Sequence, residues 1–373
     1  MAGISNLLAA QLSFGAYTKL SDYTRGFTVI NGQQVALNAQ QFVDDTDSAQ
    51  QVVAELPAGW SVDVAKSVTG SVNGTQALVF VNSTTQQVVM AFRGSTTRDQ
   101  FWSNAWDTGA TAWRGIRSAA QSSLAGVQAS YSGYEILTDG HSLGGGMAQI
   151  FALKNNLNGY GQNSLPIPYT IQNDPADFPN GFAAAINGYY QSVHGFSEVV
   201  TTGDIARAYQ NGIAPATYLS SSPLVLDNVY GAQVKLAAGL AAGFNVVIGL
   251  SALIASGLKA HIIQTVIGAL QAGKVTTTPI TFNPIEISAF DNAISGAQSA
   301  VSSNGAVVVT QKDGKVFTVA QSLTGNALTA LKPLVSGQSY LYDTSSNLAL
   351  TISSAALVGK EGSIVVNASG MLQ

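Results

Sequence analysis

The sequence predicts an α/β fold with a central, mostly parallel β-sheet flanked by helices, followed by a small β-rich C-terminal region. The first observation is an alternation of strand and helix. We expect a strand at 134–139, a helix at 143–156 and further strands at 167–173 and 196–202. This alternation is typical of a parallel sheet with helical crossovers. The second observation is that short β-like runs replace the alternation after about residue 281.

The N-terminal part supplies further elements. Apolar and polar residues alternate at helical spacing over 5–20 and predict a surface helix, whereas residues 60–67 alternate with period two and predict a strand. Two apolar runs at 76–82 and 86–92 are separated by Ser-Thr-Thr and predict a hairpin. Residues 114–131 are helix-like.

The β-like runs near the C-terminus divide the chain into a domain of residues 1–281 and a β-rich domain of residues 282–373. No internal repeat is evident, and the Gly-Gly-x-Gly-x-Asp nonapeptides that bind calcium are not found. The expected strands of the second domain are 305–311, 315–320, 339–342, 347–353 and 363–367.

The composition excludes several classes of function. The net charge is −4, from 16 basic and 20 acidic residues without a basic stripe, so we expect no nucleic-acid partner. The chain has no Cys, which excludes disulfides, thiolate catalysis and Cys-ligated zinc. Charged residues make up 10% of the chain, against about 25% in average soluble proteins. The polar surface is therefore largely uncharged, which is common in secreted proteins and suits contact with apolar substrates.

The N-terminal segment does not predict a cleavable secretory signal, because its first basic residue is Lys19 and no charged region precedes an apolar core. We expect secretion by a route without such a signal, with a cytoplasmic location as the alternative.

The strongest motif is GHSLG, residues 140–144. It follows the strand expected at 134–139 and precedes the helix expected at 143–156. In a G-x-S-x-G turn of this kind, the serine sits on a strained strand-to-helix turn, and the small flanking residues let the strand and the helix pass closely. Ser142 is therefore a candidate nucleophile. The following helix directs its first N–H groups, and the positive end of its dipole, toward a developing oxyanion.

Together, GHSLGG at 140–145 and VVMAFRGSTT at 88–97 resemble the class 3 (fungal-type) lipases of the α/β-hydrolase superfamily. The resemblance covers roughly residues 75–265. It implies a carboxylic-ester hydrolase acting on lipid-like esters, as a triacylglycerol lipase or esterase without cofactor or metal. Phospholipase A1 and polyester hydrolase activity remain open alternatives.

An acyl-transfer enzyme needs two backbone N–H groups directed at the carbonyl oxygen. One is expected from Leu143, directly after the nucleophile. The resemblance places the second at Ser95, after the buried strand that ends in Arg93.

Three histidines are candidate bases: His141, His194 and His261. His141 lies inside the nucleophile motif, where the resemblance implies a structural role. In α/β-hydrolases the catalytic groups follow the chain order Ser, then Asp or Glu, then His. His261 satisfies this order, whereas His194 directly precedes the strand at 196–202 and is expected at the opposite edge of the sheet.

Asp204 is the favoured acid, because it follows the same strand after one Gly, and VVTTGD at 199–204 resembles the family's pattern. Asp174, after the strand expected at 167–173, is the other candidate. We thus expect a triad of Ser142, Asp204 and His261. In it the imidazole moves the serine proton and the carboxylate orients the imidazole.

The segment 236–258 contains no charged residue and is long enough to span a bilayer. Its Ala and Gly content, and its position between the expected acid and base, favour a buried helix pair or an apolar lid that contacts a lipid interface. Residues 173–190 are a second candidate cover.

The resemblance weakens in two places. The family's Val-His-x-Gly-Phe segment has no counterpart in 108–133, and its Trp-containing stretch survives only as FWSNAWD at 101–107. Substrate class therefore stays open. A non-catalytic binding protein on a hydrolase scaffold is the alternative to an enzyme.

Overall fold

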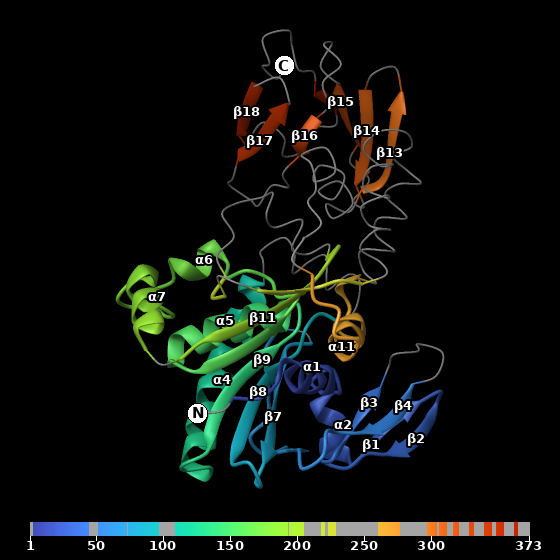
Figure 1. The fold of residues 1–373 in the computed structure, drawn as a ribbon. Helices are drawn as coiled ribbons and strands as arrows, with labels where there is room; N and C mark the ends of the chain where they lie inside the picture. Colours follow the sequence, from blue (N-terminus) through green and yellow to red (C-terminus); the bar gives the residue numbers. More distant parts are fainter. Residues whose placement is uncertain are drawn as a thin grey trace. The chain divides into compact units, whose positions relative to one another are not determined.

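The computed structural model describes residues 3–44, 51–72, 74–96, 109–192, 194–204, 218–220, 223–228 and 260–276, together with the backbone of strands between 297 and 364 (Figure 1). The chain forms two compact units. The first comprises Met1–Thr201, Ala216–Leu226 and Ile262–Val275, and the second comprises Thr202–Pro215, Asp227–His261 and Thr276–Gln373.

The first unit is built on an eight-stranded sheet in the order β12-β11-β10-β9-β8-β7-β5, with β6 also paired to β7. Strands β8 to β12 run parallel, whereas β7 is antiparallel to β8, and β5 and β6 are antiparallel to β7. The predicted α/β fold with a mostly parallel sheet is confirmed. The strands are β5 (Ser61–Val62), β6 (Val68–Thr69), β7 (Gln76–Asn82), β8 (Gln87–Phe92), β9 (Glu135–Gly140), β10 (Asn158–Gln162), β11 (Phe196–Thr201) and β12 (Leu224–Leu226).

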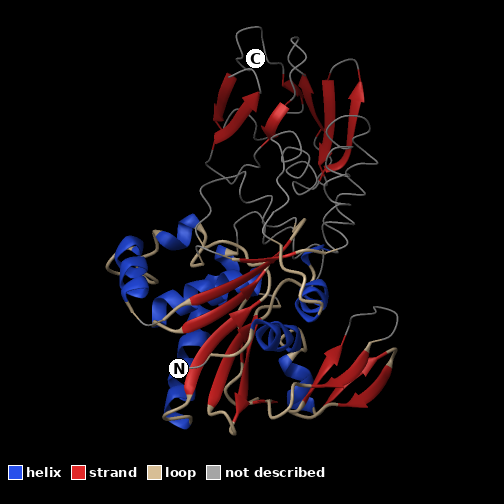
Figure 2. Ribbon diagram, in the orientation of Figure 1, coloured by secondary structure: helices blue, strands red, loops and turns tan. Residues whose placement is uncertain are grey.

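Helices cover both faces of this sheet (Figure 2). On one face, α1 packs on β8, β9 and β10, and α11 packs on β11, β12 and α1. On the other, α5 packs on β8, β9 and β10, and α4 packs on β6. The helices are α1 (Asn6–Gly15), α2 (Leu20–Arg25), α4 (Ala110–Ser130), α5 (Leu143–Asn155), α6 (Tyr169–Gln172), α7 (Phe182–Gln191) and α11 (Ile263–Gln271).

Burial explains why these segments form these elements. Every residue of β7 and β8 is buried, as expected for central strands covered on both faces. In α4 the buried side chains recur at helical spacing, at Trp113, Ile116 and Ala120 and on to Leu124 and Val127, so one apolar stripe faces the core. In α5 almost the whole helix is buried, and it lies directly behind the nucleophile motif.

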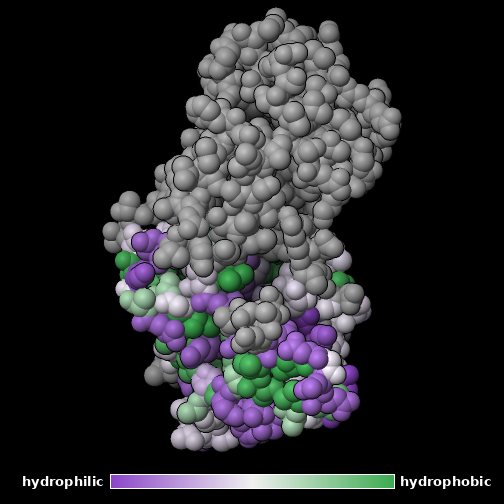
Figure 3. Space-filling view, turned by 90° about the vertical axis from the view of Figure 1, so that its right-hand side faces the viewer, coloured by the Kyte–Doolittle hydropathy of each residue, from purple (hydrophilic) through white to green (hydrophobic). Residues whose placement is uncertain are grey.

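The N-terminal region differs in part from expectation. The helix predicted at 5–20 ends at Gly15, and α2 follows it. The predicted strand at 60–67 is reduced to β5, and β6 begins at Val68. Two antiparallel hairpins were not predicted; they join β1 (Phe27–Ile30) to β2 (Gln33–Ala36) and β3 (Gln41–Asp44) to β4 (Val52–Glu55). On the face of the first unit seen in Figure 3, hydrophobic residues gather in a patch edged by hydrophilic ones.

The strand predicted at 167–173 is wrong, because Tyr169–Gln172 forms the short helix α6 and the strand between β9 and β11 is β10. The sequence of β10, NGYGQ, looks like a turn. Its glycines are required by packing. A Cβ on Gly159 would lie 2.6 Å from the Phe196 ring, and one on Gly161 would overlap the Glu198 carboxylate. The side chains of Phe196 and Glu198 thus occupy the space that side chains on β10 would otherwise need.

The second unit contains short strands in two sheets, one ordered β13-β14-β15-β19 and one ordered β16-β17-β18. All five strands predicted after residue 282 are confirmed in type, whereas β13 and β16 were not predicted. The strands are β13 (Ala297–Ser303), β14 (Ala306–Gln311), β15 (Val316–Ala320), β16 (Leu328–Leu331), β17 (Ser339–Thr344), β18 (Leu348–Ser353) and β19 (Gly362–Ile364).

Three sequence predictions fall outside the described residues: the apolar segment 236–258, the Trp-containing stretch 101–107 and the boundary at 281/282. Within the described part of the chain, no helix combines the length and apolar character needed to cross a membrane.

Candidate active site

The GHSLG motif forms a sharp turn between β9 and α5. Ser142 caps the N-terminus of α5 with φ 59° and ψ −125°, in a region that residues with a side chain rarely occupy. Such backbone strain persists only where the surrounding structure over-determines it, and it concentrates at functional sites. The Ser142 residue is 3% exposed.

Backbone hydrogen bonds to the neighbouring strand hold the turn in place. The Ser142 N–H donates to the carbonyl of Gln162 at 2.9 Å, and the Leu165 N–H donates to the Ser142 carbonyl at 3.0 Å. The Gly144 N–H donates to the carbonyl of His141 at 2.9 Å. The parallel pairing of β9 and β10 thus continues through the nucleophile position, which fixes Ser142 relative to the sheet.

Small residues on both sides of Ser142 are sterically required. A Cβ on Gly140 would overlap the backbone of Gly144, and a Cβ on Gly144 would overlap the carbonyl oxygen of Phe92. A Cβ on Gly145 would overlap the Ser164 hydroxyl. The glycines therefore let α5 approach the ends of β8 and β9 closely, as the motif predicts.

The loop after β8 lies against the turn. Phe92 pairs with Gly140, and a Cβ on Gly94 would lie 2.7 Å from the carbonyl oxygen of His141. Ser95 follows in this loop and is half-buried. Leu143 is the first residue of α5, so the helix itself does not use its N–H. Both predicted oxyanion donors are thus near the carboxyl ends of adjacent parallel strands.

The His141 side chain contacts the N-terminal region. Its Nδ1 lies 2.7 Å from the hydroxyl oxygen of Tyr17, and the residue is 4% exposed. Tyr17 follows α1, so this hydrogen bond connects the turn to the helix on the opposite face of the sheet. The contact agrees with a structural role for His141.

Asp204 and His261 lie together in the second unit. The Nδ1 atom of His261 is 2.6 Å from Oδ1 of Asp204, and both side chains are buried. The two residues are 57 positions apart in sequence. With the carboxylate ionised, the imidazole donates its Nδ1–H to Asp204, and the lone pair is then on Nε2. This is the tautomer in which an imidazole can accept a serine proton.

Asp174, the alternative acid, and His194, the alternative base, lie in the first unit and have different partners. Asp174 forms ion pairs with Arg114 at 3.3 Å and Arg117 at 3.1 Å, and a hydrogen bond from the Ala176 backbone N–H does most to lower its pKa. His194 precedes β11, at the end of the strand opposite the nucleophile turn, and its Nδ1 lies 3.1 Å from the Ser192 hydroxyl.

Comparison with known proteins identifies the region that contains this turn. Residues 67–206 match the family model of lipase (class 3). Residues 67–206 are called the class 3 lipase region below because of this match. No curated protein sequence matches the chain at a significant level.

Solved lipase structures are similar to the chain at low sequence identity. Lipase II from Rhizopus niveus is 12% identical, with 54% of this chain and 72% of that chain covered and a TM-score of 0.37. The triacylglyceride lipase of Rhizomucor miehei is 14% identical, with 61% of this chain and 82% of that chain covered and a TM-score of 0.40.

Two buried carboxyl groups in the class 3 lipase region were not singled out from the sequence. Asp139 directly precedes the turn and accepts hydrogen bonds at Oδ1 from the Gly140 N–H at 2.8 Å and from Gln162 Nε2 at 3.0 Å. Burial, with a smaller contribution from the nearby Glu198 carboxylate, raises the pKa of Asp139 to about 7 against the lowering effect of these hydrogen bonds. Asp139 is thus a buried acid that is partly protonated near neutral pH.

The second group, Glu198, supports the segment behind the turn. Its two carboxylate oxygens accept hydrogen bonds from the backbone N–H and the hydroxyl of Ser164, at 2.9 and 2.8 Å. Ser164 in turn packs against Gly145 of α5. One signal could have identified both acids, since each is a charged residue within a largely uncharged strand, in EILTDG and FSEVVT.

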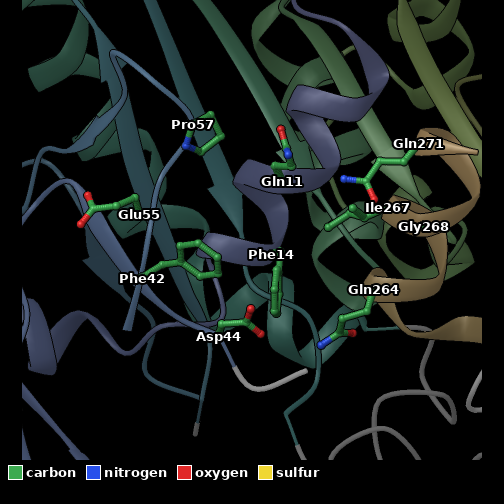
Figure 4. A pocket seen from close by; sticks show the side chains of 10 residues that line it. All are labelled: Gln11, Phe14, Phe42, Asp44, Glu55, Pro57, Gln264, Ile267, Gly268 and Gln271. Atoms are coloured by element: carbon green, nitrogen blue, oxygen red, sulfur yellow. The ribbon is translucent and has the colours of Figure 1, made fainter. Parts of the chain in front are cut away.

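The first unit also contains a cavity that involves none of the predicted site residues. It has a volume of about 340 Å³ and lies among α1, the β3–β4 hairpin and α11 (Figure 4). Phe14, Phe42 and Ile267 give it apolar walls, and Asp44 and Glu55 lie at one side. Among the described residues, no group of three or more His, Asp or Glu side chains could hold a metal ion.

Proposed function

We propose that this protein is a serine carboxylic-ester hydrolase that acts on lipid-like esters through an acyl-enzyme intermediate. Ser142 is the nucleophile, His261 is the base and Asp204 is the acid. The observation that carries the proposal is the strained backbone of Ser142 at a glycine-lined turn between a parallel strand and a helix, within a region of the class 3 lipase family.

The proposed reaction begins when Ser142 Oγ attacks the ester carbonyl carbon while Nε2 of His261 takes the hydroxyl proton. Asp204 stabilises the imidazolium through the Nδ1–H. The tetrahedral intermediate carries its negative charge on the former carbonyl oxygen, which accepts hydrogen bonds from the Leu143 and Ser95 N–H groups.

The intermediate then collapses. The bond to the alcohol oxygen breaks, His261 donates its proton to that oxygen, and the acyl group remains on Ser142. Water attacks the acyl carbon, with His261 again taking a proton, and the carboxylic acid leaves.

A fluorophosphonate probe tests the proposal directly. We expect the full chain to be labelled at Ser142 and Ser142→Ala to be unlabelled, because the alanine has no hydroxyl to phosphonylate. Ser132→Ala, which alters an exposed serine at the end of α4, is the matched control and should be labelled like the wild type. A wild-type chain that stays unlabelled at micromolar probe would contradict the proposal and favour a binding protein on a hydrolase scaffold.

Substrate class is tested by a series of nitrophenyl esters from acetyl to palmitoyl. We expect kcat/KM to rise with acyl length, because a lipid-like acyl chain buries more apolar surface. A maximum at acetyl or butyryl would reduce the proposal to a short-chain esterase.

A further inference from the structure

A second cavity of the first unit is lined by cationic and hydroxyl side chains. Its volume is about 690 Å³, and it lies among the start of α2, the turn from β6 to β7, and the loop after β8. The described residues that line it include no Asp or Glu; they are Lys19, Leu20, Ser21, Thr69, Gly70, Ser71, Val72, Gly74, Thr75, Gln76, Arg93 and Thr96.

The buried cation of this cavity is Arg93, which is 6% exposed. Its guanidinium makes one long hydrogen bond to Gln76 Oε1, at 3.4 Å, and one to the Thr96 hydroxyl, at 3.1 Å. Its Nε–H is buried without an acceptor in the described part of the chain. No ion pair to this guanidinium occurs among the described residues either, so the charge is buried there without a neutralising carboxylate.

Asp22 lies close to Arg93 but forms no ion pair with it. Burial is the largest influence on the pKa of Arg93 and lowers it, while Asp22 is close enough to act in the opposite direction. The oxygens of Asp22 are, however, already bound. Oδ1 pairs with Arg25, and Oδ2 accepts a hydrogen bond from the Thr28 hydroxyl at 2.8 Å.

The rim of the cavity supplies further donors. Lys19 is exposed, and its ammonium group makes no hydrogen bond or ion pair with any described residue. Thr69 also lines the cavity, whereas the Ser21 and Ser71 hydroxyls donate to Asp22 Oδ1 and to the Gly115 carbonyl. A buried guanidinium and an exposed ammonium form a donor set that matches phosphate, since Arg binds its oxygens as a fork and Lys as a point charge.

We propose that the cavity beside Arg93 binds a tetrahedral oxyanion of the phosphate type. The Nη–H donors of Arg93 that are not bonded to a described residue hold it from the floor, and Lys19 holds it from the rim. Arg93 lies two residues before Ser95, so an anion here would sit at the base of the proposed oxyanion loop. Binding itself does not require Ser142 to be a nucleophile, and the proposal therefore stands apart from the proposed hydrolysis.

Thermal unfolding of the full chain in sodium phosphate, against sodium chloride of equal ionic strength, tests this site. We expect phosphate at about ten times its Kd to raise Tm by a few °C, because a ligand that binds only the folded state stabilises it. Lys19→Ala should weaken the Kd, measured by titration calorimetry, about five-fold or more. Lys274→Ala, an exposed lysine at the end of α11, should leave it unchanged.

Arg93→Lys keeps the positive charge but loses the paired N–H donors of the guanidinium. It should weaken phosphate binding more than Lys19→Ala does. If this buried variant does not fold, the exposed Lys19→Ala still decides the question. Glycerophosphocholine and inorganic phosphate distinguish the sources. Binding of the diester at least as tight as that of phosphate identifies a lipid headgroup, and binding of phosphate alone identifies a free anion. No binding of either, or binding that Lys19→Ala leaves unchanged, overturns the proposal.

Discussion

The nucleophile turn and the Asp204–His261 pair are held in place in different ways. Ser142 is positioned by backbone: a strained φ, ladder hydrogen bonds to β10 and glycines that let α5 contact β8. Asp204 and His261 are joined by a short side-chain hydrogen bond between segments 57 residues apart. The turn is a local structure, whereas the pair is a tertiary contact.

This difference determines how each region should respond to mutation. A backbone-held site is sensitive to added volume and tolerates changes of charge nearby. A contact between side chains is sensitive to a change of charge or proton position that leaves its shape intact. Single substitutions can separate the two cases.

The largest effect is expected from Asp204→Asn, because an amide can hold the imidazole in the wrong tautomer without changing the shape of the site. We expect kcat on a soluble ester to fall by about 10³- to 10⁴-fold, with KM little changed. Asp174→Asn is the control, since that carboxylate pairs with arginines of α4. An Asp204→Asn enzyme that keeps more than a tenth of its kcat would remove the pair from the mechanism.

Gly144→Ala tests the backbone-held turn by volume alone. The new Cβ would overlap the Phe92 carbonyl oxygen, so α5 and the loop after β8 must separate. We expect kcat to fall by about 10²-fold and the free energy of unfolding to fall by about 1–3 kcal/mol. Gly188→Ala in α7 is the matched control, because nothing lies within 4 Å of the position that its Cβ would take; it should be neutral or slightly stabilising.

Asp139→Asn tests whether the turn tolerates a change of charge. The folded-state pKa of about 7 lies above the unfolded value, so the folded state keeps a proton that the unfolded state releases. As pH rises from about 4 to 7, the raised pKa of Asp139 therefore lowers the free energy of unfolding by up to about 4 kcal/mol in total. In urea unfolding, the variant should lose this decline and keep its activity. An identical pH profile in both proteins would contradict the raised pKa.

Tyr17→Phe should give the smallest effect. It removes the 2.7 Å hydrogen bond to His141 but keeps the ring, so we expect a loss of about 1 kcal/mol in the free energy of unfolding. Tyr134→Phe, whose hydroxyl makes no hydrogen bond to a described residue, should cost nothing measurable. Equal losses in both variants would show that the contact to His141 does not stabilise the turn.

The sequence predicted those parts of the molecule whose causes are local. The hairpin of β7 and β8, the strand β9 and the helix α5 were predicted because their apolar runs and the GHSLG motif are contiguous. The strands after residue 282 were predicted for the same reason. The chain order Ser, then Asp, then His also predicted Asp204 and His261 as partners from the sequence alone.

The predictions from sequence were wrong or incomplete where contacts between residues distant in the chain determine the structure. Strand β10 was missed because its glycines are set by the side chains of Phe196 and Glu198, which belong to another strand. The apolar run at 167–173 was taken for that strand, although it forms α6. The support that Glu198 gives to Ser164 was missed for the same reason, since it joins residues 34 positions apart.

The glycine-rich strand β10 has a consequence for folding order. A segment with so little intrinsic strand preference gains its conformation only when β9 and β11 are present on either side. Ser142 depends on β10, because its N–H donates to Gln162. We therefore expect Ser142 to acquire its final backbone conformation among the last events of folding, so that partly folded chains would lack the proposed nucleophile.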